Sequence, residues 1–324
     1  MRIKVGVVGT GYAARSRVEA LLSDRRSQPL LTAGHWHTAA FAERYGLQAV
    51  ESWQQLVNDP RIDLVIVANV SSLHGDVVEA ALQAGKPVVV EYPLSLDVLQ
   101  AKRLVELATD KGLLLHVEHI ELLGGLHQAM RKHLPDVGVP TYVNYRTLNP
   151  QHPAPLKWTY RQDLFGFPFC GALSRVHRLT NLFGQVERVD CCTQIVSREP
   201  DSDNSDYFKG ILSSARLQFE RGLVAELTYG KGENLWARRR DIEIQGEFGA
   251  LTFVGNAGTL TTAEAVRTIT VAPRKGLFVK DTRMVLDHLT DQAPLYVSAA
   301  ESVYALTVGD ALRRASESGR TVYL

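Results

Sequence analysis

Apolar runs alternate with amphipathic stretches over the first 122 residues, which is the pattern of a parallel sheet covered by helices on both faces. An apolar strand at residues 5–8 breaks into a glycine turn and continues as a helix over 15–22. This alternation predicts a doubly wound α/β domain of the Rossmann type over residues 1–122. Its later strands are expected at 30–33, 63–68, 86–90 and 113–117, and its later helices at 38–45, 52–58, 74–85 and 96–111.

The pattern changes after about residue 122. A helix is predicted as far as residue 134, followed by segments rich in β-branched and aromatic residues and joined by short turns such as 220–222. These features predict an α+β domain over residues 123–324 with a large, mostly antiparallel sheet. Its strands are expected at 139–148, 186–197, 215–219, 223–229, 240–245, 250–253 and 268–272, and its later helices before Gly184, at 278–289 and at 299–318.

Composition narrows the class of protein. The 324 residues are 45% hydrophobic and 22% charged with a formal net charge of +1, so neither disorder nor nucleic acid binding is expected. Cys170, Cys191 and Cys192 give no disulfide framework and fit a reducing compartment. No apolar run approaches about 20 residues, and the first strand leaves no room for a signal peptide. We therefore expect a cytoplasmic protein with no membrane partner, present as a monomer or a weak homo-oligomer.

The glycine turn has the chemistry of a dinucleotide site. Gly9 allows a tight turn, Gly11 lets the backbone approach a pyrophosphate, and Ala14 is small enough for the helix to pack on the strand. The phosphates would lie at the helix N-terminus, where unpaired N–H groups and the helix dipole favour anions. Gly9, Gly11, Tyr12 and Ala13 are therefore predicted to bind the cofactor. The alternative is an ordinary strand-to-helix turn without a ligand.

The end of the second predicted strand distinguishes between the two nicotinamide cofactors. An NAD site usually has a carboxylate there, which binds the ribose 2′-hydroxyl, but residues 34–38 contain no acid. The sequence therefore favours NADPH, with His35, His37 or Thr38 as partners of the 2′-phosphate. The alternative for each histidine is that it begins a surface helix.

Polar residues follow the next strands at the edge where an open α/β sheet binds its ligands. Asn69, His74 and Glu91 are predicted to contact the cofactor, although a histidine that starts a helix is more often a surface residue. Glu118 and Glu121 follow the strand at 113–117, where a carboxylate is costly unless it is used or paired. A metal site built from these acids with His116 and His119 is not favoured, because strand alternation places Glu118 and His119 on opposite faces.

A dinucleotide domain of about 120 residues followed by a helix and an open antiparallel sheet resembles the glucose-fructose oxidoreductase, inositol dehydrogenase and rhizopine catabolism family. The sugar dehydrogenases of that family carry Glu-Lys-Pro after the fourth strand and an Asp-x-x-x-His pair in the helix before the sheet. Here the lysine position holds Tyr92, and the acid/base positions hold Cys170 and Ser174. Oxidation of an alcohol needs a base within reach of the hydroxyl, so polyol dehydrogenation is disfavoured.

At the positions where the sequence differs from the sugar dehydrogenases, it resembles one branch of that family, the biliverdin reductases, and most of all the cyanobacterial ones. The resemblance implies NADPH-dependent reduction of biliverdin to bilirubin, with hydride added at the central methine carbon and a proton at a pyrrole nitrogen. The alternatives are a sugar or polyol dehydrogenase and a non-catalytic NADP-binding regulator. The segments that carry the resemblance are 91–94, 115–123, 165–168, 173–175, 182–184, 229–233, 276–278 and 294–297.

The resemblance also implies roles for individual residues. It implies that Arg175 is required for activity, and we expect Arg175 to hold a propionate or the lactam region and to stabilise charge as hydride arrives. Tyr92, Trp158 and Phe167 are expected to offer stacking surfaces to the flat bilin. The alternative for Arg175 is pairing with a surface acid. The basic run 238–240 could meet propionates, but a solvated strand end is the simpler interpretation.

The source of the proton is left open by the sequence. Glu118 and Glu121 are candidates because burial can raise the pKa of a carboxyl group. Tyr92 is a further candidate, although the ordinary pKa of tyrosine is high for a donor at neutral pH. Bulk water or a propionate of the substrate would serve equally well.

Overall fold

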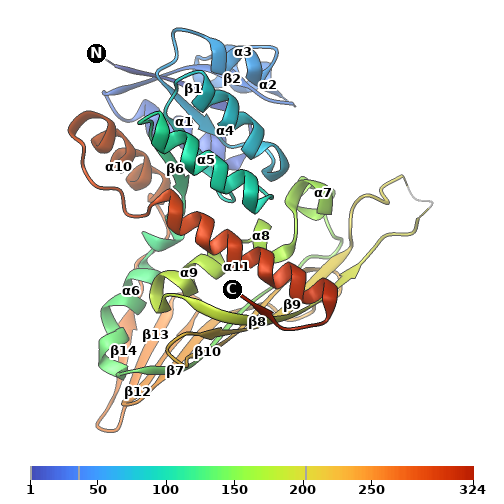
Figure 1. The fold of residues 1–324 in the computed structure, drawn as a ribbon, viewed down its shortest axis with the longest axis vertical. Helices are drawn as coiled ribbons and strands as arrows, with labels where there is room; N and C mark the ends of the chain where they lie inside the picture. The colour runs from blue at the N-terminus through green and yellow to red at the C-terminus, as the bar shows by residue number, and fades with distance from the viewer. Residues whose placement is uncertain (1, 36, 201–202) are drawn as a thin grey trace. The chain divides into compact units, whose positions relative to one another are not determined.

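A computed structural model describes residues 2–35, 37–200 and 203–324 of the chain (Figure 1). The chain forms two compact units, and each is made of two segments. Unit 1 comprises Met1–Ile120 with Lys275–Tyr304, and unit 2 comprises Glu121–Arg274 with Ala305–Leu324. The first crossing lies close to the division expected after residue 122. The return of Lys275–Tyr304 to unit 1 was not expected.

Unit 1 is built around a six-stranded parallel sheet with the strand order β3-β2-β1-β4-β5-β6. The predicted doubly wound Rossmann fold is confirmed. Its strands are β1 Ile3–Val8, β2 Ser27–Ala33, β3 Gln48–Ala49, β4 Leu64–Val67, β5 Val88–Glu91 and β6 Leu115–Glu118. The connecting helices are α1 Tyr12–Leu22, α2 Thr38–Tyr45, α3 Trp53–Asn58, η1 Ser71–Leu73, α4 His74–Gln83 and α5 Val98–Asp110.

Local chemistry explains where several of these elements begin and end. Gly46 ends α2 with φ +68°, a conformation that glycine adopts without strain. Ser52 caps α3 by accepting a hydrogen bond from the Gln55 N–H. Three elements begin earlier than predicted: β1 at Ile3, α1 at Tyr12 and β2 at Ser27. The strand β2 thereby includes Pro29, which the sequence places in a break. Proline is tolerated there because β3 pairs only with the later part of β2.

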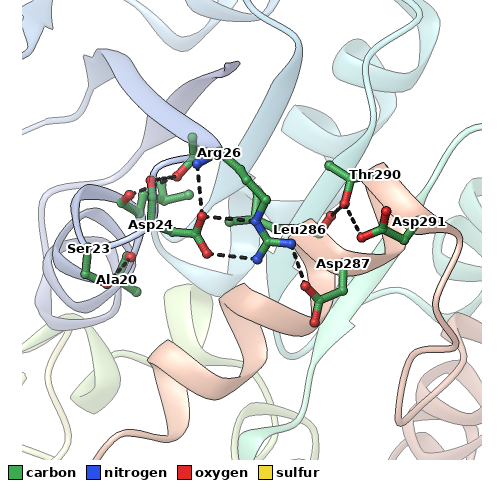
Figure 2. A network of polar contacts seen from close by, with 10 residues as sticks. Ala20, Ser23, Asp24, Arg26, Leu286, Asp287, Thr290 and Asp291 are labelled. Atoms are coloured by element: carbon green, nitrogen blue, oxygen red, sulfur yellow. Dashed lines mark hydrogen bonds and ion pairs between the residues drawn. The ribbon is translucent and has the colours of Figure 1, made fainter. Parts of the chain in front are cut away.

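The helix α10 (Leu277–Asp291) belongs to unit 1 although it lies far along the chain. Figure 2 shows one reason: the guanidinium of Arg26, just before β2, lies between Asp24 and Asp287. The Arg26 Nη1 atom is 2.5 Å from the Asp287 Oδ1 atom. The edge of the Tyr12 ring also packs on Phe278, with the centroids 5.9 Å apart. These contacts join segments more than 250 residues apart in sequence, which hydrophobic periodicity does not reveal.

Unit 2 contains a nine-stranded sheet with the order β14-β13-β12-β11-β7-β10-β9-β8-β15. Every neighbouring pair is antiparallel except β7 and β10, so the predicted mostly antiparallel sheet is confirmed. The strands are β7 Pro140–Pro150, β8 Val186–Val196, β9 Gly210–Phe219, β10 Val224–Gly232, β11 Arg239–Gly246, β12 Gly249–Val254, β13 Ala257–Thr262, β14 Val266–Thr270 and β15 Val322–Tyr323.

Short helices and one long helix complete the chain. The helix α11 has the predicted bounds, and its first residues belong to unit 1 while the remainder belongs to unit 2. None of the described helices is long and apolar enough to cross a membrane. The elements are η2 Ile120–Leu122, α6 Gly125–His133, η3 Leu134–Val137, η4 Trp158–Tyr160, α7 Gln162–Phe165, α8 Pro168–Gly171, α9 Ser174–Phe183 and α11 Ala299–Ser318.

Strand alternation places one row of side chains across the middle of the unit 2 sheet. Tyr229 on β10 pairs with Thr147 on β7 and with Ser213 on β9, while Arg240 on β11 pairs with Thr147 from the other side. Directly paired residues point to the same face of a sheet. Arg240, Thr147, Tyr229 and Ser213 therefore form a polar row. Arg175 of α9 lies against Tyr229 on this face.

Candidate active site

The glycine turn after β1 leaves room for a ligand. Gly9 has φ +123°, and a Cβ atom there would lie 2.3 Å from the Ala68 carbonyl oxygen, so only glycine fits. No described atom lies within 4 Å of the place where a Cβ of Gly11 would be, and α1 has no side-chain cap or acidic residue in its first turn. The first N–H groups of a helix lack intrahelical partners. The turn therefore has the space and the donors that a pyrophosphate needs, and the binding roles of Gly9, Gly11, Tyr12 and Ala13 stay predictions.

The end of β4 lies next to this turn and carries an unused acceptor. A Cβ at Gly9 would also lie 3.0 Å from the Asn69 backbone nitrogen. The side-chain oxygen of Asn69 is buried and has no hydrogen-bond partner among the described residues. A buried polar atom without a partner is costly, so a ligand hydroxyl or amide at this position would stabilise it. Asn69 thus remains a predicted cofactor residue.

His74 lies in the interior rather than on the surface. It is 2% exposed, with Nδ1 at 2.7 Å from the Pro93 carbonyl oxygen and Nε2 at 3.3 Å from the Asn69 carbonyl oxygen. Burial lowers its pKa more than these carbonyls raise it, so the ring is neutral at pH 7. The interpretation of His74 as a surface helix start is wrong. Both ring nitrogens face backbone carbonyls, so His74 helps to fix the positions of Asn69 and Pro93, and its contact with a cofactor stays a prediction.

The residues expected near a 2′-phosphate lie at the end of β2. His35 and His37 are exposed, and His37 adopts φ +58° just before α2. A Cβ at Gly34 would lie 2.8 Å from the Thr10 methyl group and 3.2 Å from the Thr38 hydroxyl. Thr38 is therefore close to the glycine turn, and no carboxylate lies between residues 34 and 38.

Glu91 belongs to a buried ionic network that the sequence interpretation missed. Its Oε1 atom accepts a hydrogen bond from the Arg17 Nε atom at 2.9 Å, and Arg17 Nη1 donates to Asp281. Asp281 also bonds to His116 Nε2 at 2.8 Å and to the Tyr296 hydroxyl at 2.7 Å. Arg17 is 1% exposed and Asp281 is fully buried. Glu91 therefore anchors α1 and α10 to β5, in addition to its predicted place beside the cofactor.

The pKa values of the two predicted proton donors, Glu118 and Glu121, are shifted in opposite directions. Glu118 is 1% exposed and lies opposite Glu91 in the sheet. Burial, followed by the charge of Glu91, raises the pKa of Glu118 well above its usual value. Burial alone would raise the pKa of Glu121 too, but the guanidinium groups of Arg178 and Arg274 outweigh it and lower that pKa. Glu121 therefore lacks the raised pKa on which its prediction as a proton donor depends.

Tyr92 follows β5 and presents a fixed ring. It stacks on His119 with the ring centroids 5.3 Å apart and an interplanar angle of 5°. His119 is held in turn by a 2.8 Å hydrogen bond between Nε2 and the Ser302 hydroxyl. Within the described residues no three metal-ligating side chains form a group, and His116 and His119 have separate protein partners.

Arg175 lies in the first turn of α9 and covers an aromatic ring. Its Cζ atom is 4.7 Å from the centroid of Tyr229, and Nη1 donates to the Ser174 hydroxyl at 3.3 Å. One turn later, Arg178 donates to the Tyr145 hydroxyl at 2.8 Å and pairs with Glu121. A guanidinium can stack on a ring with its plane and bind a carboxylate or carbonyl oxygen through its N–H edge. The predicted cation thus lies on an aromatic platform.

The segment before α9 supplies the predicted aromatic surfaces. Trp158 is 37% exposed and tilts against Phe165 at 6.1 Å, while Phe167 packs edge-on against Phe169 at 6.1 Å. Lys231, for which the sequence indicates no role, lies beneath this segment. Its Nζ atom is 3.8 Å from the centroid of Phe165. Because Lys231 and Tyr229 share one face of β10, the structure brings Trp158, Arg175 and Lys231 into one region of unit 2.

The acid/base positions of the sugar dehydrogenases are occupied by groups that cannot take an alcohol proton. Cys170 is 3% exposed, and burial raises the pKa of its thiol to about 12. Ser174 is 6% exposed and accepts a hydrogen bond from Arg175. Neither side chain is a base at neutral pH.

Comparisons with known proteins agree with this geometry. A biliverdin reductase from Synechocystis sp. PCC 6803, solved in complex with biliverdin and NADP+, is 48% identical over 97% of this chain and 99% of its own, with a TM-score of 0.94. Biliverdin reductase A of Mus musculus is 27% identical over 92% of this chain and 89% of its own. The scyllo-inositol 2-dehydrogenase (NADP(+)) IolW of Bacillus subtilis is 23% identical over 86% of this chain and 83% of its own.

Two family descriptions together account for nearly the whole chain. An oxidoreductase family with an NAD-binding Rossmann fold matches residues 3–119, and the C-terminal alpha/beta domain of the same family matches residues 136–324. The second match alone covers more than half of the chain. The chain therefore belongs to the GFO/IDH/MocA family of NAD(P)-dependent oxidoreductases, and it is similar over nearly its whole length to biliverdin reductases.

Proposed function

We propose that the chain reduces biliverdin to bilirubin with NADPH. The observation that carries the proposal is the stacking of Arg175 on Tyr229 beside the aromatic segment 158–169, where a sugar dehydrogenase would need an acid/base pair. A bilin offers a flat conjugated face and two carboxylates, and this region offers rings and a guanidinium. The similarity to the Synechocystis enzyme, which binds biliverdin and NADP+, supports the same conclusion.

Residues of unit 1 would hold the cofactor, which supplies a hydride when bound. The N–H groups at the start of α1 would take the pyrophosphate, and Thr38, His35 or His37 would take the 2′-phosphate. The acid-free end of β2 supports NADPH, because a carboxylate there would repel the extra phosphate.

Residues of unit 2 would bind and polarise the bilin. Trp158 and Phe167 would stack on its face. Arg175 would hold a propionate or a lactam oxygen. Adding hydride to the methine carbon leaves negative charge on the tetrapyrrole until a pyrrole nitrogen is protonated, and a guanidinium in place before the reaction stabilises that charge.

The proton can come from Glu118, from water or from a propionate of the substrate. Glu118 is the carboxyl group whose pKa is raised, by burial and then by the charge of Glu91, so it is the protein acid we favour. Its side chain accepts a hydrogen bond from the Ile120 N–H at 2.6 Å through Oε1. That leaves the second oxygen to carry the proton.

The direct test of the function is spectroscopic. Purified protein is mixed with NADPH and biliverdin, and we expect loss of the red absorbance of the bilin, growth of a yellow product and equimolar consumption of NADPH. The same protein with scyllo-inositol and NADP+ is the matched assay for the dehydrogenase alternative. An unchanged bilin spectrum between pH 5 and 9 would exclude the proposal, and reduction of NADP+ by the polyol would support the alternative.

Cofactor choice gives a second prediction, centred on His35. We expect NADPH to be used with at least about tenfold higher kcat/KM than NADH, and His35→Asp to lower kcat/KM for NADPH by about tenfold or more, since like charges at a phosphate site repel. The neutral variant His35→Asn is the matched control, and its kcat/KM for NADPH should fall less than that of His35→Asp. Equal efficiency with the two cofactors in the unaltered protein would show that the end of β2 does not select the phosphate.

A further inference from the structure

Lys231 carries a buried amino group that is enclosed by aromatic rings. It lies on β10 and is 6% exposed. Its Nζ atom lies 3.8 Å from the ring centroid of Phe165, 4.8 Å from that of Tyr160 and 5.4 Å from that of Phe208. The same atom donates a hydrogen bond to the Thr159 carbonyl oxygen. Lys231 thus ties the segment that carries Trp158 to the central strand of unit 2.

No carboxylate bonds to this amino group within residues 2–35, 37–200 and 203–324. The titratable groups around it are Tyr160 from η4, Arg175 from α9 and Tyr229, which lies two residues earlier on the same face of β10. Glu233, just after β10, is engaged by the Ala154 N–H at 2.7 Å. The ion pair of Arg161 with Asp163 lies beside α7 at the surface. A buried lysine without an acid is rare in a stable core and marks a functional position.

The charge of Lys231 depends on its cationic neighbour. Burial, followed by the charge of Arg175, lowers the pKa of Lys231 to about 7. An anion bound at Arg175 would cancel part of that repulsion and favour the protonated amine. Binding linkage is reciprocal, so the protonated amine must in turn favour anion binding by the same free energy.

We propose that Lys231 is a positioning residue for the bilin, which takes up a proton when a carboxylate of the substrate is bound at Arg175 and then holds the segment 158–165 on β10. The inference rests on the proposed function. The neutral amine keeps its place among the rings, whereas the ammonium group adds its attraction to three ring faces and a charge-assisted hydrogen bond to Thr159. Substrate binding thereby fixes the aromatic surface that stacks on the substrate.

Equilibrium binding of biliverdin to the NADP+-loaded protein tests this without turnover. Between pH 6.5 and 9 we expect the Kd for biliverdin to rise, by about tenfold if binding raises the pKa of Lys231 by one unit. The bilin carboxylates stay ionised throughout this window. Calorimetry in two buffers of different ionisation enthalpy should show proton uptake on binding near pH 8.

Three variants separate the role of Lys231 from that of its surroundings. Lys231→Met keeps an unbranched side chain that is one atom shorter and cannot take up a proton. Lys231→Arg keeps a permanent charge. Both variants should therefore bind biliverdin with a Kd that is flat over this pH range. Lys157→Met removes an exposed lysine from the same segment and should retain the pH dependence of the unaltered protein. The inference would be overturned if the Kd for biliverdin rose with pH as steeply in Lys231→Met and Lys231→Arg as in the unaltered protein. Absence of any biliverdin binding would instead overturn the proposed function.

Discussion

Replacing Arg175 with alanine is expected to lower kcat/KM for biliverdin about 100-fold, with the affinity for NADPH and the melting temperature unchanged. The physical reason is that the guanidinium stabilises charge that develops as hydride arrives, and loss of one such preorganised donor typically costs a factor of about 10² to 10³. Arg175 is half-buried and stacks on Tyr229, so its removal exposes a ring but breaks no strand pairing. Steady-state kinetics with biliverdin as the varied substrate measures the effect.

Two further variants control this result. Arg175→Lys keeps the charge but loses the planar fork, so its activity should lie between those of the alanine variant and the unaltered protein. Arg216→Ala removes an exposed arginine from the same sheet, where it pairs with Glu226 on the surface, and should leave kinetics unaltered. Near-normal turnover by Arg175→Ala would remove the central role assigned to this residue.

Much of the fold could be predicted because it follows local patterns. The strand β4 is apolar throughout and β5 is apolar up to Glu91, as strands buried on both faces must be, and Gly46 and Gly184 end their helices with positive φ. The strands that were missed carry weak patterns. The strands β3 and β15 have two residues each, and β13 contains Leu260 as its one large apolar side chain.

The site was predicted only in part, because its charges are set by partners distant in the chain. Glu118 and Glu121 are three residues apart and looked equivalent, yet one lies beside Glu91 and the other between two guanidinium groups. Lys231 lies within one of the segments that carry the family resemblance, but the sequence does not indicate its burial among the rings of Tyr160, Phe165 and Phe208.

Arg17 did leave a signal in the sequence. It lies within α1 on the face formed by Ala14, Val18 and Leu21, all of which are fully buried. A charged residue in an apolar helical stripe must be paired, since an unpaired buried charge costs several kcal/mol. The pattern therefore indicates that a buried acid exists. It does not say that the acid is Asp281, more than 260 residues away.

The largest effect on stability is expected from Arg17→Ala, which should lower the free energy of unfolding of unit 1 by about 3 to 5 kcal/mol. The variant leaves Asp281 and Glu91 without their shared cation, and Asp281 is fully buried. Urea unfolding followed by circular dichroism measures the loss. Arg313→Ala, which removes a partly exposed cation from Asp310 and Glu317, should cost no more than about 1 kcal/mol.

A double variant tests whether the loss of stability in Arg17→Ala comes from the Asp281 carboxylate that is left without its cation. Arg17→Met with Asp281→Asn removes the cation and the buried negative charge together, while the amide can still bond to His116 and Tyr296. The double variant should lose at least about 1 kcal/mol less unfolding free energy than Arg17→Met and Asp281→Asn lose together as single variants. The reason is that the effects of substitutions within one network are not additive. If the costs simply add, or if Arg17→Ala unfolds like the unaltered protein, the network does not hold α10 to unit 1. The return of this helix to the Rossmann unit would then depend on Arg26 and on the packing of Phe278.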